Sequence, residues 1–123
     1  YVSDSSLEFS KISVPTISIN EYCQINKAYP DFIKIDVEGS EGKVIEGALD
    51  MIATKHPIIA MEVWKEKNLS HRKAASRLFD LGYKMYSIDD SGDPRFVCDT
   101  EKDFLHIKFD DGLQSYHNFL FMI

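Results

Sequence analysis

A short apolar run that turns abruptly acidic, residues 32–41, constrains the fold more than any other part of this sequence. Its first half, residues 32–37, is β-branched and mostly apolar, which is typical of a strand buried on both faces inside a parallel sheet. Asp36 and Glu38 fall where this strand ends, and Gly39 allows the backbone to turn into a helix. Ligands bind at the carboxyl ends of strands in open α/β sheets, so two carboxylates at this point indicate a functional site.

Hydrophobic periodicity divides the remaining chain into further strands and helices. We expect strands at residues 11–14, 58–63, 83–88, 105–109 and 119–123, helices at residues 18–27, 40–55 and 70–81, and turns at residues 89–94 and 111–112. Ser18 and Glu21 fit a capping box. Ser70 is the expected N-cap of the last helix, and Gly82 is its expected left-handed C-terminal residue. This order of elements indicates a layered α/β sheet with right-handed crossovers.

Length, charge and cysteine content narrow the class of protein. The chain has 123 residues, which suits one domain with one hydrophobic core. Its formal net charge of −6 disfavours attraction to nucleic acid or to an anionic membrane. No apolar stretch approaches the roughly 20 residues of a membrane-spanning helix. Cys23 and Cys98 lack the spacing of a metal site, so we expect reduced thiols in a cytoplasmic protein without a nucleic-acid or membrane partner.

The segment Lys34-Ile-Asp-Val-Glu-Gly-Ser-Glu41 resembles the K-x-D-V-E-G-x-E signature of the FkbM family of S-adenosylmethionine-dependent methyltransferases. Further likenesses follow at the spacing expected in that family, at Gly47-Ala48, Pro57 to Glu62, Gly82-Tyr83 and Asn118 to Phe121. Together they extend from about Thr16 to the end of the chain. The resemblance matches the C-terminal half of the family's catalytic domain.

The resemblance implies an α/β chain with a partial Rossmann-like class I methyltransferase fold, in which a mostly parallel sheet carries an antiparallel terminal strand. Class I methyltransferases hold the cofactor with a glycine-rich turn after their first strand, and no D-x-G-x-G run occurs here. We therefore expect residues 1–123 to form a single domain, the C-terminal portion of a methyltransferase domain without its glycine-rich, cofactor-binding N-terminal half. The chain is then either a fragment of a longer protein or a remnant that has lost this half.

Three carboxylates are the candidate catalytic residues: Asp36, Glu38 and Glu62, the last at the end of the second buried strand. Neighbouring parallel strands lie about 4.8 Å apart, so acids that end both strands are expected to converge on one crevice. Such a cluster suits a general base for an acceptor hydroxyl, a Mg²⁺ or Ca²⁺ site, or placement of the positively charged cofactor S-adenosylmethionine, for which Asp36 is the candidate. The structural alternative has Asp36 capping the next helix, Glu38 facing solvent and Glu62 paired with a lysine.

Three further residues lie close to these strand ends in the sequence or in the expected sheet. Trp64 is the candidate substrate-binding residue, because an indole at the mouth of a crevice can stack on a sugar or adenine ring; alternatively it covers the end of the sheet. Lys34, inside an apolar strand, is expected to neutralise the carboxylates from behind. His117, just before the last strand, is an alternative base.

The resemblance implies an S-adenosylmethionine-dependent O-methyltransferase that acts on a hydroxyl of a sugar or natural-product-like small molecule. A non-catalytic binding or assembly module that retains the fold is the alternative from another class. A metal-dependent hydrolase is a weaker third interpretation, since such sites usually contain histidine ligands. In the expected strand order the apolar edge of residues 32–37 lacks a partner, which predicts a homodimer through this edge or its cover by residues 11–14.

Overall fold

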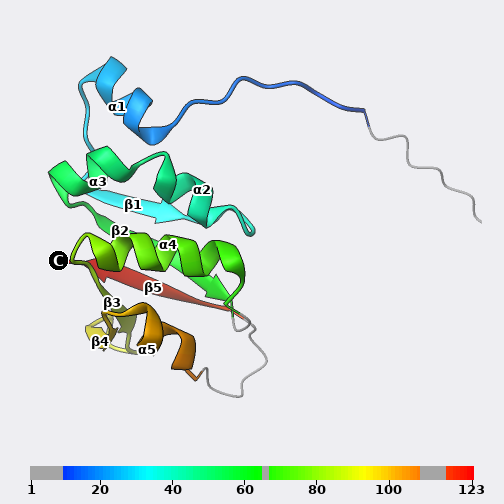
Figure 1. Cartoon of the computed structure of the whole chain (residues 1–123). Helices are drawn as coiled ribbons and strands as arrows, with labels where there is room; N and C mark the ends of the chain where they lie inside the picture. Colours follow the sequence, from blue (N-terminus) through cyan, green and yellow to red (C-terminus); the bar gives the residue numbers. More distant parts are fainter. Residues whose placement is uncertain (1–9, 65–66, 109–115) are drawn as a thin grey trace, which may run out of the picture.

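The computed structural model describes residues 10–64, 67–108 and 116–123, which form a five-stranded sheet with helices packed on one face (Figure 1). The strands are β1 (Phe32–Ile35), β2 (Ile58–Trp64), β3 (Lys84–Ile88), β4 (Pro94–Cys98) and β5 (Tyr116–Met122). Their order across the sheet is β1-β2-β5-β3-β4. The terminal strand β5, red in Figure 1, therefore lies in the middle of the sheet.

The expectation of a mostly parallel sheet is wrong, although the antiparallel terminal strand is present. β1 pairs with β2 in parallel, whereas β5 runs antiparallel to both β2 and β3, and β4 runs antiparallel to β3. β1, β2 and β3 still point in one direction, because β2 and β3 share β5 as an antiparallel neighbour. The insertion of β5 and the β3–β4 hairpin make antiparallel pairing the majority.

β1 is an edge strand, and two expectations for it are wrong. Burial on both faces was expected, but Phe32 is 54% exposed and Ile35 is the only buried residue of the four. Residues 11–14 are exposed and form no strand, so within the described residues β1 pairs with β2 alone. Pairing of this edge with a second copy of the chain stays a prediction.

The described helices are α1 (Ile19–Asn26), α2 (Glu41–Glu46), α3 (Leu49–Lys55), α4 (Leu69–Asp80) and α5 (Glu101–His106). The Ser18 hydroxyl accepts a hydrogen bond from the Glu21 amide at 3.1 Å, which confirms the predicted cap of α1. The cap predicted for α4 is wrong, because the Asn68 side chain accepts the His71 amide there at 3.0 Å. Ser70 lies inside the helix and is free to bond elsewhere.

The single helix expected over residues 40–55 is two helices. α2 ends at Glu46 with Gly47 as its C-cap, and Ala48 adopts a non-helical φ of −121° before α3 begins. The apolar pattern continues through this break, since Ile45, Ala48 and Ile52 are all fully buried. Periodicity alone therefore did not reveal the break.

The region after β3 differs most from expectation. The strand expected at residues 105–109 is wrong where it is described, since α5 extends to His106. Thr100 caps this helix by accepting a hydrogen bond from the Asp103 amide at 3.2 Å. This cap residue indicates a helix, but the alternation of apolar residues after it favoured a strand. Strand β4 was not predicted, and the hairpin at residues 111–112 lies outside the described residues. The left-handed Gly82 after α4, with a φ of 87°, is confirmed.

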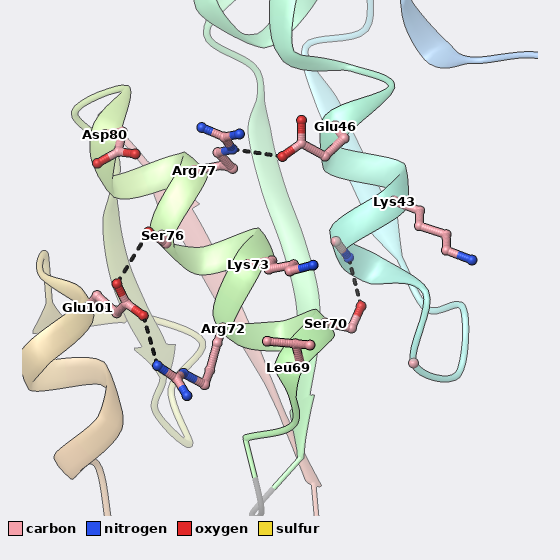
Figure 2. Close-up of a pocket in the computed structure, with 12 residues that line it drawn as sticks. Lys43, Glu46, Leu69, Ser70, Arg72, Lys73, Ser76, Arg77, Asp80 and Glu101 are labelled. Carbon is pink, nitrogen blue, oxygen red and sulfur yellow. Dashed lines mark hydrogen bonds and ion pairs between the residues drawn. The ribbon is translucent and has the colours of Figure 1, made fainter.

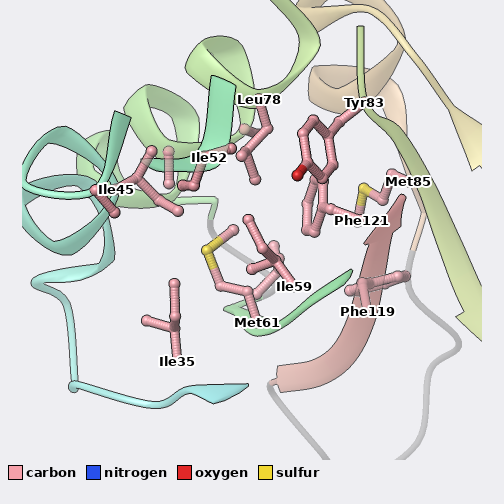
Figure 3. Close-up of a cluster of buried hydrophobic side chains, with 14 of the residues drawn as sticks. Ile35, Ile45, Ile52, Ile59, Met61, Leu78, Tyr83, Met85, Phe119 and Phe121 are labelled. Atoms are coloured by element: carbon pink, nitrogen blue, oxygen red, sulfur yellow. The ribbon is translucent and has the colours of Figure 1, made fainter. Parts of the chain in front are cut away.

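The core lies between the sheet and the helices (Figure 3). One row of partnered residues crosses all five strands on this face: Ile33, Ile59, Phe121, Met85 and Cys98. All of these residues except Ile33 are buried. Against the row pack apolar side chains of α2, α3 and α4, among them Ile45, Ile52 and Leu78.

The opposite face carries a second continuous row, formed by Lys34, Ala60, Leu120, Tyr86 and Phe96. The rings of Tyr86 and Phe96 meet edge to face at a centroid distance of 6.0 Å. Phe96 is 59% exposed, and Phe32, on the edge strand at the other side of the sheet, is also accessible. Within the described residues, this face of the sheet is therefore only partly covered.

Leu78 and Leu69 allow the packing of α4 against the sheet to be tested with identical substitutions. Leu78 is fully buried, whereas Leu69 is 64% exposed on the same helix. We expect Leu78→Ala to lower the free energy of unfolding by about 2–5 kcal/mol, because a cavity adds to the lost burial. Leu69→Ala is expected to change it by less than about 0.5 kcal/mol. Urea unfolding followed by circular dichroism measures both, and equal effects would contradict this packing.

We predict that the protein loses stability at alkaline pH because the buried hydroxyl of Tyr83 ionises there. Burial raises the pKa of Tyr83 from 10.0 to about 12, and its hydroxyl donates to the Pro57 carbonyl at 2.8 Å. A raised folded-state pKa favours folding below pH 10.0, and that contribution is lost as the pH rises towards 12. Tyr83→Phe should cost about 1–3 kcal/mol at neutral pH by leaving the carbonyl unbonded. It should also make stability fall less steeply in this alkaline window, as urea unfolding at several pH values would measure; an unchanged slope would contradict the assignment.

Candidate active site

Three carboxylates converge at the carboxyl ends of β1 and β2. Asp36, Glu38 and Glu62 each present an oxygen that lies within 4.8 Å of the others. Asp36 and Glu38 are exposed, whereas Glu62 is buried at 8% exposure. The predicted convergence is thus present in the structure, and we call these three residues the carboxylate cluster.

The parallel pairing of β1 and β2 explains the convergence. Ile35 is the register partner of Met61, so the next residue of each strand, Asp36 and Glu62, arrives at the same end of the sheet. Glu38 then follows in a tight turn, with a φ of 52° at Glu38 itself and 97° at Gly39. A left-handed conformation costs a non-glycine residue roughly 1–2 kcal/mol, so the surrounding structure must hold Glu38 in place.

The structural alternative for these acids is largely wrong. α2 has Ser40 at its N-cap position with no side-chain cap bond, so Asp36 does not cap it. Glu62 accepts a hydrogen bond from the Trp64 indole Nε1 at 2.9 Å, and no lysine among the described residues forms an ion pair with it. Glu38 is exposed, as that alternative expected.

Lys34 lies beside the carboxylate cluster, as the sequence suggested. Its Nζ is 3.4 Å from the Asp36 carboxylate, and both side chains are about half exposed, at 46% and 51%. Exposed ion pairs contribute only about 0–1 kcal/mol, because solvent screens them. Lys34 therefore offsets part of the cluster's negative charge without fixing its geometry.

Trp64 and Lys67 are held from the helix side. The Trp64 ring meets the His71 ring of α4 edge on, at a centroid distance of 5.3 Å. The Lys67 Nζ donates to the Ile107 carbonyl at 2.7 Å, which ties Lys67 to the end of α5, and burial lowers the pKa of Lys67. Trp64 thus both orients Glu62 and packs at the end of the sheet.

Asn118 is a neighbour of the cluster that sequence reasoning missed. It is the antiparallel register partner of Glu62, and opposed residues in such a pair share one face of the sheet. Its place in an apolar terminal strand was the available signal, but using it required knowing that β5 lies beside β2. His117 pairs with Val63 and so lies on the other face, which means that the structure does not bring it to the carboxylate cluster.

A groove of about 840 Å³ lies between α2 and α4, on the helix side of the molecule (Figure 2). Ion pairs flank it, with the Arg77 Nε 2.7 Å from the Glu46 carboxylate and Arg72 Nη2 3.2 Å from the Glu101 carboxylate. None of the three residues of the carboxylate cluster lines this groove, although Gly39, which lies between Glu38 and α2 in the sequence, does. The groove is therefore a separate feature of the surface.

The cluster has the chemistry of a site for cationic or hydroxyl-bearing ligands. Carboxylate oxygens are the donors that hard cations prefer, and a carboxylate can also accept a proton from a hydroxyl.

Within the part of the chain that the structure describes, no helix is long and apolar enough to cross a membrane. The fold and the site together define an α/β protein with an acidic centre at the end of two parallel strands.

Comparison with known protein families identifies the family of this α/β chain. The family described as the methyltransferase FkbM domain matches residues 2–85, which are 84 of the 123 residues. The chain belongs to this family. The match includes the whole carboxylate cluster and Trp64 but ends before β4, so the resemblance noted at residues 118–121 lies beyond it. No curated protein and no solved structure matches the chain.

Terbium luminescence tests the geometry of the cluster. Tb³⁺ prefers oxygen ligands as Ca²⁺ does, and a nearby indole sensitises its emission, so Tb³⁺ at the cluster should emit on excitation of Trp64. Loss of an outer-shell partner already weakens metal sites by about 10–100-fold, so Glu62→Gln should weaken Tb³⁺ binding at least as much. Glu101→Gln, remote from the cluster, is the control. Equal affinities for both variants would show that the three carboxylates do not act together.

Proposed function

We propose that this chain is the acceptor-side portion of an S-adenosylmethionine-dependent O-methyltransferase with a Rossmann-like fold. Its substrate is proposed to be a hydroxyl of a sugar or natural-product-like small molecule. The observation that carries the proposal is the carboxylate cluster, whose oxygens lie within 4.8 Å of one another in a chain of the FkbM methyltransferase family. Elements outside these 123 residues are proposed to supply the glycine-rich turn.

Each residue of the cluster has a role in the proposal. S-adenosylmethionine, when bound, supplies a methyl group on a positively charged sulfur. Asp36, exposed at the end of β1, attracts that charge, and Glu38 lines the same crevice. Glu62 acts as the general base, because it is buried and its second oxygen is held by the Trp64 indole. Trp64 contributes an apolar surface against which the acceptor packs.

Methyl transfer depends mainly on the alignment of the acceptor hydroxyl with the methyl group. In an in-line displacement at the methyl group that the bound cofactor would supply, Glu62 would accept the proton that the acceptor hydroxyl loses as its oxygen takes up the methyl group. Such an in-line displacement gains most from holding the two reactants close and aligned, which can contribute about 7–11 kcal/mol of the barrier. A cluster fixed by two paired strands suits that task better than one on a loop.

A binding or assembly module is the second candidate. One sequence observation favours it: the six glycines of the chain form no cofactor-cradling run. Under this proposal the acids would serve partner recognition, and the chain would not discriminate S-adenosylhomocysteine from other nucleosides.

Calorimetric titration of the chain with S-adenosylhomocysteine, with and without Mg²⁺, separates the two candidates. The methyltransferase proposal expects saturable binding that Asp36→Asn weakens by about tenfold or more, the effect of one lost charge-assisted contact. Asp90→Asn, in the exposed turn between β3 and β4, is the matched control and should bind like the unaltered chain. Binding of S-adenosylhomocysteine no tighter than that of adenosine would favour the module.

A further inference from the structure

A buried contact between a glutamate and a histidine connects the two helices behind the carboxylate cluster. Glu41, the first residue of α2, and His71 of α4 are both 0% exposed, with the Glu41 Oε2 3.4 Å from the His71 Nε2. Two other donors reach the same carboxylate, the Gly39 amide at 3.1 Å and the Ser70 hydroxyl at 3.5 Å. A buried charge is tolerated where several partners compensate it, and Glu41 has them.

Close packing of α2 on α4 makes this pair possible. A Cβ atom at Gly42 would lie 3.0 Å from the Ser70 carbonyl oxygen, which is too close for an ordinary contact. The Gly42 amide donates to the Ser70 hydroxyl at 2.9 Å. Glycine at this position therefore lets the first turn of α2 approach α4, and Glu41 is carried to His71.

Each of the two residues is connected by further contacts to the candidate active site. On one side Glu41 accepts from the amide of Gly39, the residue that follows Glu38. On the other side the His71 ring accepts from the Trp64 amide through Nδ1 at 3.5 Å and packs against the indole, whose Nε1 donates to Glu62. A continuous chain of contacts thus runs from the turn that carries Glu38 to the side chain of Glu62.

We propose that Glu41 and His71 are positioning residues, which hold the Gly39 turn and Trp64 and thereby set how Glu38 and Glu62 face each other. Neither residue touches the cluster itself in this proposal. The inference rests on the proposed function for its purpose, because the alignment matters to methyl transfer. The coupling itself is a property of the folded chain and is testable without any ligand.

Trp64 is the only tryptophan of the sequence, which makes its spectrum unambiguous. Ultraviolet resonance Raman scattering reports the strength of the hydrogen bond from its indole N–H, and amide hydrogen exchange reports the Gly39 N–H. Glu41→Gln should shift the Trp64 signal although Glu41 reaches the indole through His71. His71→Gln should speed exchange at Gly39 although it reaches that amide through Glu41. Glu46→Gln, which breaks the exposed contact to Arg77 between the same two helices, should change neither signal.

The coupling is overturned if, in folded variants, each substitution affects its own neighbour and leaves the other signal as in the unaltered chain. Should either single variant fail to fold, the double variant Glu41→Gln/His71→Gln replaces both partners by neutral amides and leaves no buried charge without a partner. It should still shift the Trp64 signal, and an unaltered signal would overturn the proposal equally.

A separate titration with S-adenosylhomocysteine distinguishes failure of this inference from failure of the proposed function. If Glu41 and His71 position the cluster, Glu41→Gln should weaken binding by about tenfold, as loss of orienting partners commonly does. An unaltered chain that binds S-adenosylhomocysteine no more tightly than adenosine would count against the proposed function, while the spectroscopic result would still decide the coupling. Binding at full strength by Glu41→Gln with a shifted Trp64 signal would contradict the positioning role.

Discussion

The parallel pairing of β1 with β2 is the interaction on which the rest of this structure depends. Four register pairs join the two strands, and they bring both carboxyl ends to one edge of the sheet. A slip of either strand by one residue would turn that strand over, because side chains alternate between faces. A slip of β1 would take Ile35 out of the core, and a slip of β2 would bring Glu62 into it. Burial of the apolar row thus fixes the register, and the register fixes the carboxylate cluster.

Much of the fold could be predicted because local signals and burial agreed. The helix caps at Ser18 and the glycine after α4 are short-range features, and they appear as expected. The predictions are wrong where tertiary contacts determine the secondary structure. Residues 40–55 keep one apolar stripe through a break that their periodicity does not reveal, and α5 resembles an alternating strand until its Thr100 cap is noticed.

The candidate site was predictable in part for the same reason. Asp36, Glu38 and Glu62 follow strands that the sequence marks clearly, so their convergence needed only adjacent parallel strands. Glu41 could not be placed, because its partner His71 is 30 positions away in the sequence. Asn118 could not be placed, because it lies in β5, which enters the sheet out of chain order. Their roles depend on topology that no local pattern contains.

The partly covered face of the sheet has a thermodynamic consequence. The heat capacity of unfolding rises with the apolar area that unfolding newly exposes to water. Phe32 and Phe96 are already more than half accessible in the folded chain, so they contribute little to that increase. Covering these two rings with a partner would therefore increase the heat capacity change of unfolding and make stability depend more steeply on temperature.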